Sequence, residues 1–556
     1  MDIYLYQLSS TRKLKLSLSI QVDLRFWQER GRSIQTLYRV TSMNQAIQLL
    51  QQPVQTLPSL QPIPLPTFTL QWEKVQAAAD LLFLQFQGRS LLADELIALL
   101  RRMNGKVKEE ECFAAIQYLF LQKKVQLLPG VEWGTWAVTA ICHRCSAGYP
   151  YLSWRHCATC GGRCAMCNYC YLLGRSRSCA PLLRFASSPE VKTNRFVRVN
   201  LPHQLTPAQQ QAARQIRQSL ASEQKRVLFW AVTGAGKTEC LVPVVKNQLE
   251  QGHNVLWVTP RKDVVLELAP RLKRIFSTIH PIALYGGSSE LGQTSSLVVA
   301  TAHQALRYYQ YFSLAIVDEV DAFPLYRNPM LTFGIERALT VSAKQVLVTA
   351  TPPDHWRRVS KHFQCSVVVL PIRHHGYPLP VPIMKKEPKL WLKIAHYQPV
   401  PTVDAFVRQV LKTDGQAILF VPRLKDLFAL HQWLQKRLHP EQVESVYAQD
   451  LKREQKIQQF RQGKIRFLIS TTILERGVTV SRCHVAVVGA DHIVFDRATL
   501  IQIAGRVGRS AAYQLGTVWL IAQEKTDAQI DAIKEIKKLN RLAKKAGFWT
   551  KGLYSL

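Results

Sequence analysis

Seven of the twelve cysteines in this 556-residue chain fall within one short segment. The segment reads "CHRCSAGYPYLSWRHCATCGGRCAMCNYC", and an eighth cysteine follows close behind it. Cysteines separated by two residues present two sulfurs from one tight turn, which suits tetrahedral Zn²⁺. Eight such ligands would hold two zinc ions, and the spacing alone permits several pairings of the cysteines. The eight are Cys142, Cys145, Cys157, Cys160, Cys164, Cys167, Cys170 and Cys179.

The alternative interpretation of this segment is a redox cluster or a disulfide-bonded loop. The N-terminus lacks an apolar signal core followed by a cleavage site, which predicts a cytoplasmic protein, and in that reducing compartment clustered cysteines more often bind metal. Four sulfurs per ion leave no open coordination position, so the zinc would be structural. It would hold a segment too small to fold by hydrophobic burial alone. The remaining cysteines, expected in the core, are Cys112, Cys240, Cys365 and Cys483.

A second chemical signal is the stretch "FWAVTGAGKTE" at residues 229–239. A strand is predicted to end at Val232, followed by a glycine loop and a helix. Backbone N–H groups of such a loop and the positive end of the helix dipole bind phosphate. Lys237 is expected to reach the β- and γ-phosphates of ATP, and Thr238 to ligate Mg²⁺. The predicted ATP-binding residues of this loop are Thr233, Gly234, Ala235, Gly236, Lys237, Thr238 and Glu239.

Two further stretches complement the phosphate loop. In "LAIVDEVDAFP" an apolar strand ends at Asp318 and Glu319, which predicts a ligand for Mg²⁺ and a base for the attacking water; a lone Asp-Glu pair would otherwise indicate an ion pair or a turn. In "LIQIAGRVGRS" two guanidinium groups are spaced to stabilise charge on the γ-phosphate as arginine fingers. The predicted catalytic residues are Lys237, Thr238, Asp318, Glu319, Gln502, Arg506 and Arg509.

The strands and helices that must position these residues are predicted from the alternation of two kinds of segment. From Leu205 onward, short β-rich apolar runs alternate with helical stretches, in two series separated by a Pro- and His-rich join. Such alternation is typical of parallel sheets covered by helices on both faces. The fold class is therefore α/β, with domains predicted at residues 203–372 and 396–556 and a linker at 373–395.

The N-terminal third is predicted to be mainly helical. Its predicted segments are an N-terminal region with a Gln/Pro-rich linker (1–70), a helical accessory domain (71–138), the zinc module (139–182) and a basic linker (183–202). In the accessory domain, helices followed by a hairpin indicate either a winged-helix-like DNA binder or a packing domain. The basic stretch has aromatic residues among its arginines, which suits single-stranded nucleic acid or a solvated linker.

The charge balance points to a polyanionic partner. Lys and Arg number 72 against 38 Asp and Glu, for a net charge of +34. Nucleic acid is the first candidate, an anionic membrane surface the second, and solubilising surface charge the third. No apolar run approaches the ~18 residues that a membrane-spanning helix needs.

Residues 205–513 resemble superfamily 2 helicases motif by motif, from "LTPAQ" with Gln209 on the adenine side to "TTILERGVTV" with Gly477 and "QIAGRVGR". "AVTGAGKTE" has the form usual in that superfamily, and "DEVD" and "TAT" resemble its acidic-box and coupling motifs. The resemblance implies two RecA-like domains. Residues implied in coupling are Asp321, Thr349 and Thr351. Residues implied in DNA contact are Thr259, Pro260, Arg261, Thr301, His303, Gln304, Ser470, Thr471 and Thr472.

Together with the cysteine segment, these motifs resemble the ComFA family of late competence proteins over about residues 140–545. "CHRC" and "CNYCYLLGRS" match that family's two cysteine pairs. The resemblance implies a first zinc site of Cys142, Cys145, Cys167 and Cys170 and leaves Cys157, Cys160, Cys164 and Cys179 for a second. It also implies contacts with a competence DNA channel, a phosphoribosyltransferase-like competence partner and recombination-loading proteins, at the inner face of the cell membrane.

We therefore expect an ATP-dependent translocase of single-stranded DNA that drives DNA uptake during natural transformation. One alternative is a duplex DNA helicase of replication or repair, or an RNA remodelling helicase, although Gln502 in place of the histidine usual in DEAD-box RNA helicases favours DNA. A second alternative is a zinc-dependent nucleic-acid clamp in which ATP only switches the conformation.

Overall fold

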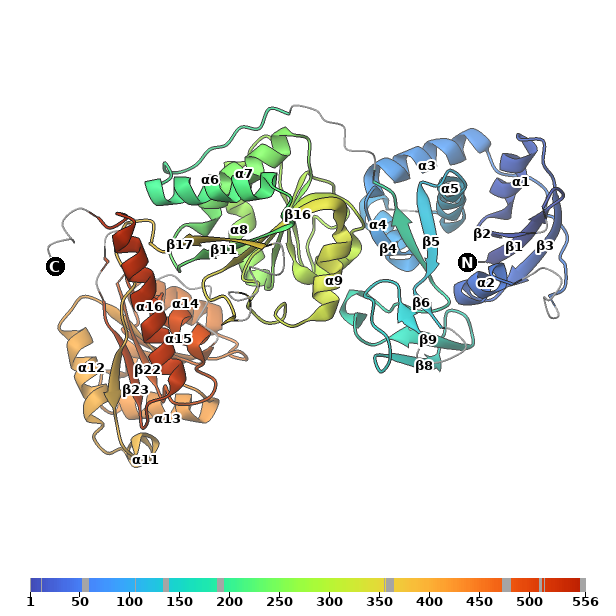
Figure 1. Ribbon diagram of the computed structural model, residues 1–556. Helices are drawn as coiled ribbons and strands as arrows, with labels where there is room; N and C mark the ends of the chain where they lie inside the picture. The colour runs from blue at the N-terminus through green and yellow to red at the C-terminus, as the bar shows by residue number, and fades with distance from the viewer. Residues whose placement is uncertain are drawn as a thin grey trace. The chain divides into compact units, whose positions relative to one another are not determined.

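The computed structural model describes residues 2–11, 13–52, 60–105, 107–133, 140–187, 195–354, 356, 365–472, 482–509, 513–514 and 516–550. The chain divides into two compact units. Unit 1 comprises Met1–Asn200 and Lys246–Gln345, and unit 2 comprises Leu201–Val245 and Val346–Leu556. Figure 1 shows the elements of each unit with the labels used below.

The N-terminus folds as a small antiparallel sheet in the order β2-β1-β3. Its strands are β1 (Ile3–Leu8), β2 (Leu14–Ser17) and β3 (Ile34–Val40), accompanied by helices α1 (Ile20–Gln28) and α2 (Met43–Leu50). Both faces of this sheet are covered, because Ile3 and Leu5 of β1 are buried in one hydrophobic cluster and Tyr6 and Leu8 in another. The N-terminal region therefore contains strands as well as the predicted helices.

The accessory domain combines three helices with a second antiparallel sheet. Its elements in chain order are α3 (Trp72–Phe86), β4 (Ser90–Leu92), α4 (Ala93–Asn104), α5 (Glu109–Leu121), β5 (Val125–Pro129) and β10 (Pro181–Phe185). The sheet has the order β4-β10-β5, with Leu183 opposite Leu91 on one side and Leu127 on the other. This element order fits the winged-helix-like alternative considered from the sequence.

The cysteine module lies between β5 and β10 in the chain and is therefore an insertion in the accessory domain. Its elements are β6 (Val131–Glu132), β7 (Ile141–Cys142), β8 (Leu152–His156), β9 (Arg163–Cys167) and the short helix η3 (Tyr171–Leu173). The predicted basic linker begins inside strand β10, where Leu183 and Phe185 are fully buried. The first residues of that stretch thus belong to the accessory core, which local sequence did not reveal.

The first α/β domain is built on a seven-stranded sheet in the order β13-β14-β12-β15-β16-β11-β17. Its strands are β11 (Arg226–Ala231), β12 (Val255–Thr259), β13 (Ile282–Leu284), β14 (Leu297–Thr301), β15 (Phe312–Val317), β16 (Leu339–Thr349) and β17 (Cys365–Leu370). Its helices are α6 (Pro207–Ala221), α7 (Lys237–Glu250), α8 (Lys262–Ile275), η4 (Ala302–Arg307) and α9 (Pro329–Ala338). β12 and β15 are entirely buried and β14 pairs in parallel with β12, as expected for a covered parallel sheet.

The second α/β domain has a six-stranded sheet in the order β18-β23-β22-β19-β21-β20, in which every neighbouring pair is parallel. Its strands are β18 (Ile383–Lys386), β19 (Gln416–Phe420), β20 (Val443–Val446), β21 (Phe467–Ser470), β22 (Cys483–Val488) and β23 (Val518–Ala522). Its helices are α11 (Leu390–Ala395), α12 (Pro401–Leu411), α13 (Leu424–Gln435), α14 (Arg453–Arg461), α15 (Arg497–Ala504) and α16 (Asp527–Lys545).

The segment predicted as a linker at residues 373–395 contributes β18 and α11 to this second domain. Leu390 and Ile394 of α11 are buried in its core beside Trp433. The two parallel sheets predicted from the alternating runs are confirmed. Among the described residues, no helix is both long and apolar enough to cross a membrane.

Candidate metal centres and nucleotide-binding motifs

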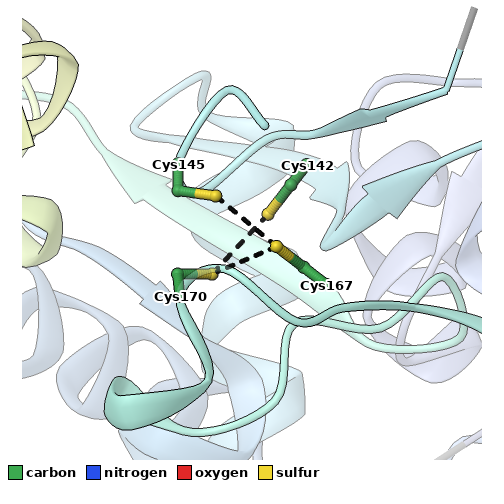
Figure 2. Close-up of side chains that lie close together, drawn as sticks. All are labelled: Cys142, Cys145, Cys167 and Cys170. Carbon is green, nitrogen blue, oxygen red and sulfur yellow. Dashed lines mark hydrogen bonds between the residues drawn. The ribbon is translucent and has the colours of Figure 1, made fainter. Parts of the chain in front are cut away.

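The first cysteine cluster consists of Cys142, Cys145, Cys167 and Cys170, whose sulfurs all lie within 4.8 Å of one another. Figure 2 shows the four side chains converging; Cys142 and Cys167 end strands β7 and β9, and Cys145 and Cys170 follow them. The Sγ atoms of Cys142 and Cys170 are 3.9 Å apart, and those of Cys145 and Cys167 are 3.6 Å apart. All four side chains are buried.

These separations fit a tetrahedral zinc site. A Zn–S bond of about 2.3 Å places neighbouring sulfurs of a tetrahedron about 3.8 Å apart. A disulfide would require an S–S distance of about 2.05 Å, and all four cysteines are free thiols. The donor set therefore suits a closed structural site, with no ligand position left for chemistry.

Arg144 supports this first cluster from the same turn, and its side chain is fully buried. Its Nη2 lies 3.1 Å from the Sγ of Cys170 and 2.8 Å from the carbonyl oxygen of the same residue. Its Nη1 donates to Leu173, and Nη2 also donates to the carbonyl of Gly174. Because a Zn(Cys)₄ site carries two excess negative charges, a buried guanidinium both neutralises it and orients one ligand. Sequence comparison used Arg144 only as part of the "CHRC" match and missed this role.

The second cysteine cluster consists of Cys157, Cys160, Cys164 and Cys179, again with all sulfurs within 4.8 Å. The structure thus groups the eight cysteines in the two sets favoured by the family resemblance. Cys160 is only partly buried, unlike the other seven. Arg177 lies beside this cluster, with its Nη1 3.9 Å from the Sγ of Cys157, and forms an ion pair with Asp94.

The remaining cysteines lie outside both clusters; Cys112, Cys240 and Cys483 are buried, as expected for core residues, whereas Cys365 is only partly buried. Burial raises the pKa of Cys112, Cys240 and Cys483 to about 12, so these thiols stay protonated at neutral pH. Burial also raises the pKa of Cys365.

The nucleotide loop lies in unit 2 between β11 and α7, and helix α7 begins at Lys237 as predicted. Gly234 and Gly236 adopt left-handed conformations, with φ of 78° and 74°. A side chain at Gly236 would overlap the amide of Gln209, which donates from Nε2 to the carbonyl of Ala235 over 2.8 Å. The loop therefore has the backbone and the close contact that require glycine.

Gln209 is itself fixed at the start of helix α6. Thr206 and Gln209 form a reciprocal capping box, in which the Gln209 N–H donates to the Thr206 hydroxyl and the Thr206 N–H donates to Oε1 of Gln209. The capping box occupies the side-chain oxygen of Gln209 and thereby directs its Nε2 to the loop.

Residues from the predicted linker also contact this loop, which sequence reasoning missed. The His374 backbone N–H donates to the carbonyl of Gly234 over 3.1 Å, and Arg373 packs beside Gly234. Arg373 donates from Nη1 to the carbonyls of Val507 and Gly508. Burial and the nearby Arg509 lower the pKa of Arg373 to about 10, so it remains a cation at neutral pH. The run "IRHH" was the only sequence signal.

The arginine-finger motif lies on and after helix α15. Gln502 donates from Nε2 to the hydroxyl of Thr351 over 3.2 Å, and the Thr351 N–H donates to the hydroxyl of Thr349. Arg506 is buried, and Arg509 donates to the carbonyl of Gly505. Thr351 of the "TAT" motif is thus bonded to one predicted catalytic residue, and Thr349 is bonded to Thr351.

The acidic pair lies in unit 1 at the end of β15. The N–H of Glu319 donates to Oδ1 of Asp318, and Glu319 has a left-handed φ of 48°. The nearest guanidinium nitrogen of Arg261 lies 3.9 Å from a carboxylate oxygen of Glu319. Asp321 follows in the same turn, and all three residues are partly buried.

The predicted DNA-contact residues of unit 1 follow strands β12 and β14. Thr259 is fully buried and donates its hydroxyl to the carbonyl of Arg261 across Pro260. Thr301 and Gln304 are buried, and burial lowers the pKa of His303, so this imidazole is neutral at pH 7. In unit 2, Ser470 ends β21 and is buried, with Thr471 and Thr472 next to it. Gly477 lies outside the described residues.

Two arginines that sequence reasoning missed join the second half of unit 1 to its N-terminal domains. Arg307 ends η4, contacts Gln304 and forms an ion pair with Glu95 of α4. Arg337, at the end of α9, donates to the carbonyls of His143 and Arg144 over 2.9 and 2.6 Å. Burial and the nearby Arg184 lower the pKa of Arg337 to about 9, so it too stays charged at neutral pH.

The described folds and motifs agree with the family comparisons. Residues 202–367 match the family "Type III restriction enzyme, res subunit" and residues 402–511 match the "Helicase conserved C-terminal domain". These two parallel-sheet domains define a helicase-like ATPase of superfamily 2.

The N-terminal part specifies the family. Residues 78–184 match the "Competence protein ComFA N-terminal domain". The chain is 38% identical over 405 residues to Competence protein ComFA of Bacillus subtilis (strain 168), which covers 73% of this chain and 86% of the relative. It is 37% identical over 380 residues to Competence protein ComFA of Streptococcus pneumoniae (strain ATCC BAA-255 / R6), covering 68% and 86%. The chain therefore belongs to the ComFA family.

Among solved structures, the chain is similar to that titled "Structure of RecG bound to three-way DNA junction", with 20% identity and a TM-score of 0.45. That match covers 62% of this chain and 47% of the other.

Proposed function

We propose that this protein is an ATP-driven translocase that draws single-stranded DNA into the cytoplasm during natural transformation, at the inner face of the cell membrane. The observation that carries the proposal is the preformed nucleotide loop, whose left-handed glycines are braced by Gln209 on one side and His374 on the other. A loop held with its N–H groups ready for phosphate spends little free energy on ordering when ATP binds.

The residues of unit 2 bind the nucleotide in this proposal. The loop N–H groups and Lys237 hold the phosphates, Thr238 ligates Mg²⁺, and Gln209 lies on the adenine side. Arg506 and Arg509 supply positive charge to the γ-phosphate in the transition state. The bond from Gln502 to Thr351 lets the coupling motif sense the nucleotide through a direct contact.

The acidic residues of unit 1 have roles of their own in this proposal. Asp318 ligates Mg²⁺, and Glu319 orients the attacking water and accepts its proton. Mg²⁺, when bound, neutralises charge on the β- and γ-phosphates. Arg261 lies in a predicted DNA-contact segment and also beside Glu319, so it offers a direct route from the DNA to the catalytic base.

Each cysteine cluster holds one structural Zn²⁺ in this proposal. The supporting observations are the two sets of four converging sulfurs and the guanidinium beside each set. Zinc would hold the cysteine module in shape, and the ions take no part in hydrolysis.

The decisive experiment is steady-state ATPase activity of the zinc-loaded full chain with single-stranded DNA, duplex DNA and RNA added in turn. We expect strong stimulation by single-stranded DNA and its loss, by about 100-fold or more, in Lys237→Ala, because the phosphate contact acts in the transition state. Lys246→Ala is the matched control, since Lys246 lies in the same helix and its partly exposed side chain forms an i,i+4 ion pair with Glu250.

The other outcomes select the alternatives. Preferential stimulation by RNA or by duplex would replace the proposal with a remodelling or repair helicase. Nucleotide-dependent DNA affinity without turnover would indicate a clamp whose ATP site only switches its conformation.

A further inference from the structure

The charged residues of the cysteine module are all positive, apart from the cysteines themselves. Between Glu132 and Glu190 the sequence contains six arginines and no lysine, aspartate or glutamate. The six are Arg144, Arg155, Arg163, Arg175, Arg177 and Arg184. Two tetrathiolate zinc sites would carry about two excess negative charges each, so the arginines must be divided between internal neutralisation and external binding.

Three of the six serve inside the protein. Arg144 donates to the first cysteine cluster, and Arg177 lies beside the second while pairing with Asp94. Arg184 donates to the carbonyl of His143 and lies over the ring of Tyr309. The remaining arginines are exposed to solvent.

Two of the exposed arginines, Arg155 and Arg175, line one open pocket of about 220 Å³. Asn168 and Tyr171 also line it, with the buried Met166 and Cys167 behind them. The hydroxyl of Ser153 accepts from both Arg155 Nε and Asn168 Nδ2, at 3.4 and 3.0 Å, which holds the guanidinium and the amide side by side. The pocket therefore offers two cations, an amide and an exposed aromatic ring around an apolar floor.

An aromatic platform adjoins this pocket. Tyr151 stacks on Tyr169 with ring centroids 4.4 Å apart and planes 18° from parallel. The Asn168 N–H donates to the Tyr151 carbonyl, so the platform and the pocket share one backbone connection. Tyr151 and Tyr171 both remain exposed although each has a large apolar ring. Such rings accept successive bases of an unpaired strand.

We propose that this pocket binds one nucleotide of a single DNA strand, with the phosphate between Arg155 and Arg175 and the base on Tyr171. Naming DNA as the nucleic acid rests on the proposed function. The volume is below the roughly 300 Å³ at which enclosed small-molecule sites begin, so it suits one unit of a longer chain rather than a separate small ligand. Guanidinium groups bind phosphate bidentately, and Asn168 can hydrogen-bond a base edge. A flat anionic membrane would not need a concave site with an amide.

The test is binding of a fluorescently labelled oligothymidylate to the zinc-loaded full chain without nucleotide. In Arg155→Gln/Arg175→Gln we expect affinity to fall at least about tenfold. The slope of log affinity against log salt should become shallower by about 0.7, since the pocket holds one phosphate and each phosphate contact to a single strand contributes about 0.7. Arg163→Gln is the matched control, because Arg163 is an exposed arginine of the same β8–β9 hairpin that does not line the pocket.

Tyr171 provides a second, charge-neutral arm. Tyr171→Ala should weaken binding by about tenfold with the salt slope unchanged, and Tyr171→Phe should retain affinity because stacking needs only the ring. Zinc content, measured for each variant, shows whether the module is still folded.

Each remaining outcome has a definite meaning. If the parent chain fails to bind the oligonucleotide, the proposed function fails; if the parent binds and the double arginine variant binds equally well, only this inference fails. An equal loss in Arg163→Gln would reduce the effect to general charge and overturn the pocket. Lost binding to anionic phospholipid vesicles with unchanged DNA binding would overturn it in favour of a membrane surface.

Discussion

The two cysteine clusters have the same ligands but different surroundings. In the first, all four cysteines are buried, and Arg144 places its guanidinium against a ligand sulfur while bonding three carbonyls. Arg337 of α9 holds the same turn from outside through the carbonyls of His143 and Arg144. The second cluster has a partly exposed Cys160 followed by two glycines, and its arginine is 3.9 Å from the nearest sulfur.

The two clusters have the same number of ligands, so the importance of each for the fold must depend on what surrounds it. The first cluster lies where the module meets the α9 end of unit 1, whereas the second closes a hairpin tip and packs on Met166. We therefore expect loss of the first to be felt through much of unit 1, and loss of the second to remain local. The following experiments test that contrast.

The largest effect is expected from Cys142→Ser/Cys170→Ser. Zinc should fall from about two to about one per chain, and unit 1 should lose its cooperative thermal unfolding, since structural zinc binding is worth about 10–16 kcal/mol. Elemental analysis and calorimetry would measure both. Cys112→Ala, at a buried cysteine outside the clusters, should keep both zinc ions.

A smaller effect is expected from Cys157→Ser/Cys179→Ser. One zinc should again be lost, but the main unfolding transition should persist with a lowered midpoint, because the hairpin tip can fray alone. The same elemental analysis and calorimetry apply. A collapse as complete as that of the first variant would show that the two clusters are equivalent.

Arg144→Met should weaken zinc binding at the first cluster by about 10–100-fold, the usual range for loss of a residue that orients a metal ligand. Competition with a chromophoric chelator would measure this, with Arg163→Met as the exposed counterpart. Unchanged competition would mean that Arg144 serves only the carbonyls.

Arg337→Met should have the smallest effect. Both zinc ions should remain, while unit 1 loses about 1–3 kcal/mol from the carbonyls left without their donor. Chemical denaturation monitored beside zinc content would separate the two readouts. Lost zinc would show that α9 is needed for the first cluster to form at all.

The parts predicted from sequence were those with a local signal. The buried runs "LAIVDE" and "NVLWVT" became β15 and β12 because uniform apolar character marks a covered parallel strand. The glycine loop and the start of α7 at Lys237 were predicted because their chemistry is local too. The spacing of the cysteines indicated metal binding, but only the family resemblance indicated which four cysteines form each site.

The missed parts depend on distant partners. Strand β10 pairs with β4 across the entire cysteine module, so nothing near residues 181–185 indicates a sheet. Arg373 and His374 gain their roles from Gly234 and Gly508, far away in the chain. In the sequence Arg144 does not differ from the other arginines of the module, and only its complete burial distinguishes it.

The placement of the cysteine module between β5 and β10 has a consequence for biosynthesis. The central strand of the accessory sheet is β10, in which Pro181 lies opposite Pro129 of β5. Because β10 follows the cysteine module in the chain, it leaves the ribosome only after every cysteine of both clusters. Until then helices α3 to α5 are accompanied only by strands β4 and β5, and the strand that pairs with both of them is still missing. Capture of zinc by the emerging segment would shorten the loop that must close, which lowers the entropic cost of adding the last strand. A shortage of zinc would thus leave the nascent accessory domain open, with its apolar face available to chaperones.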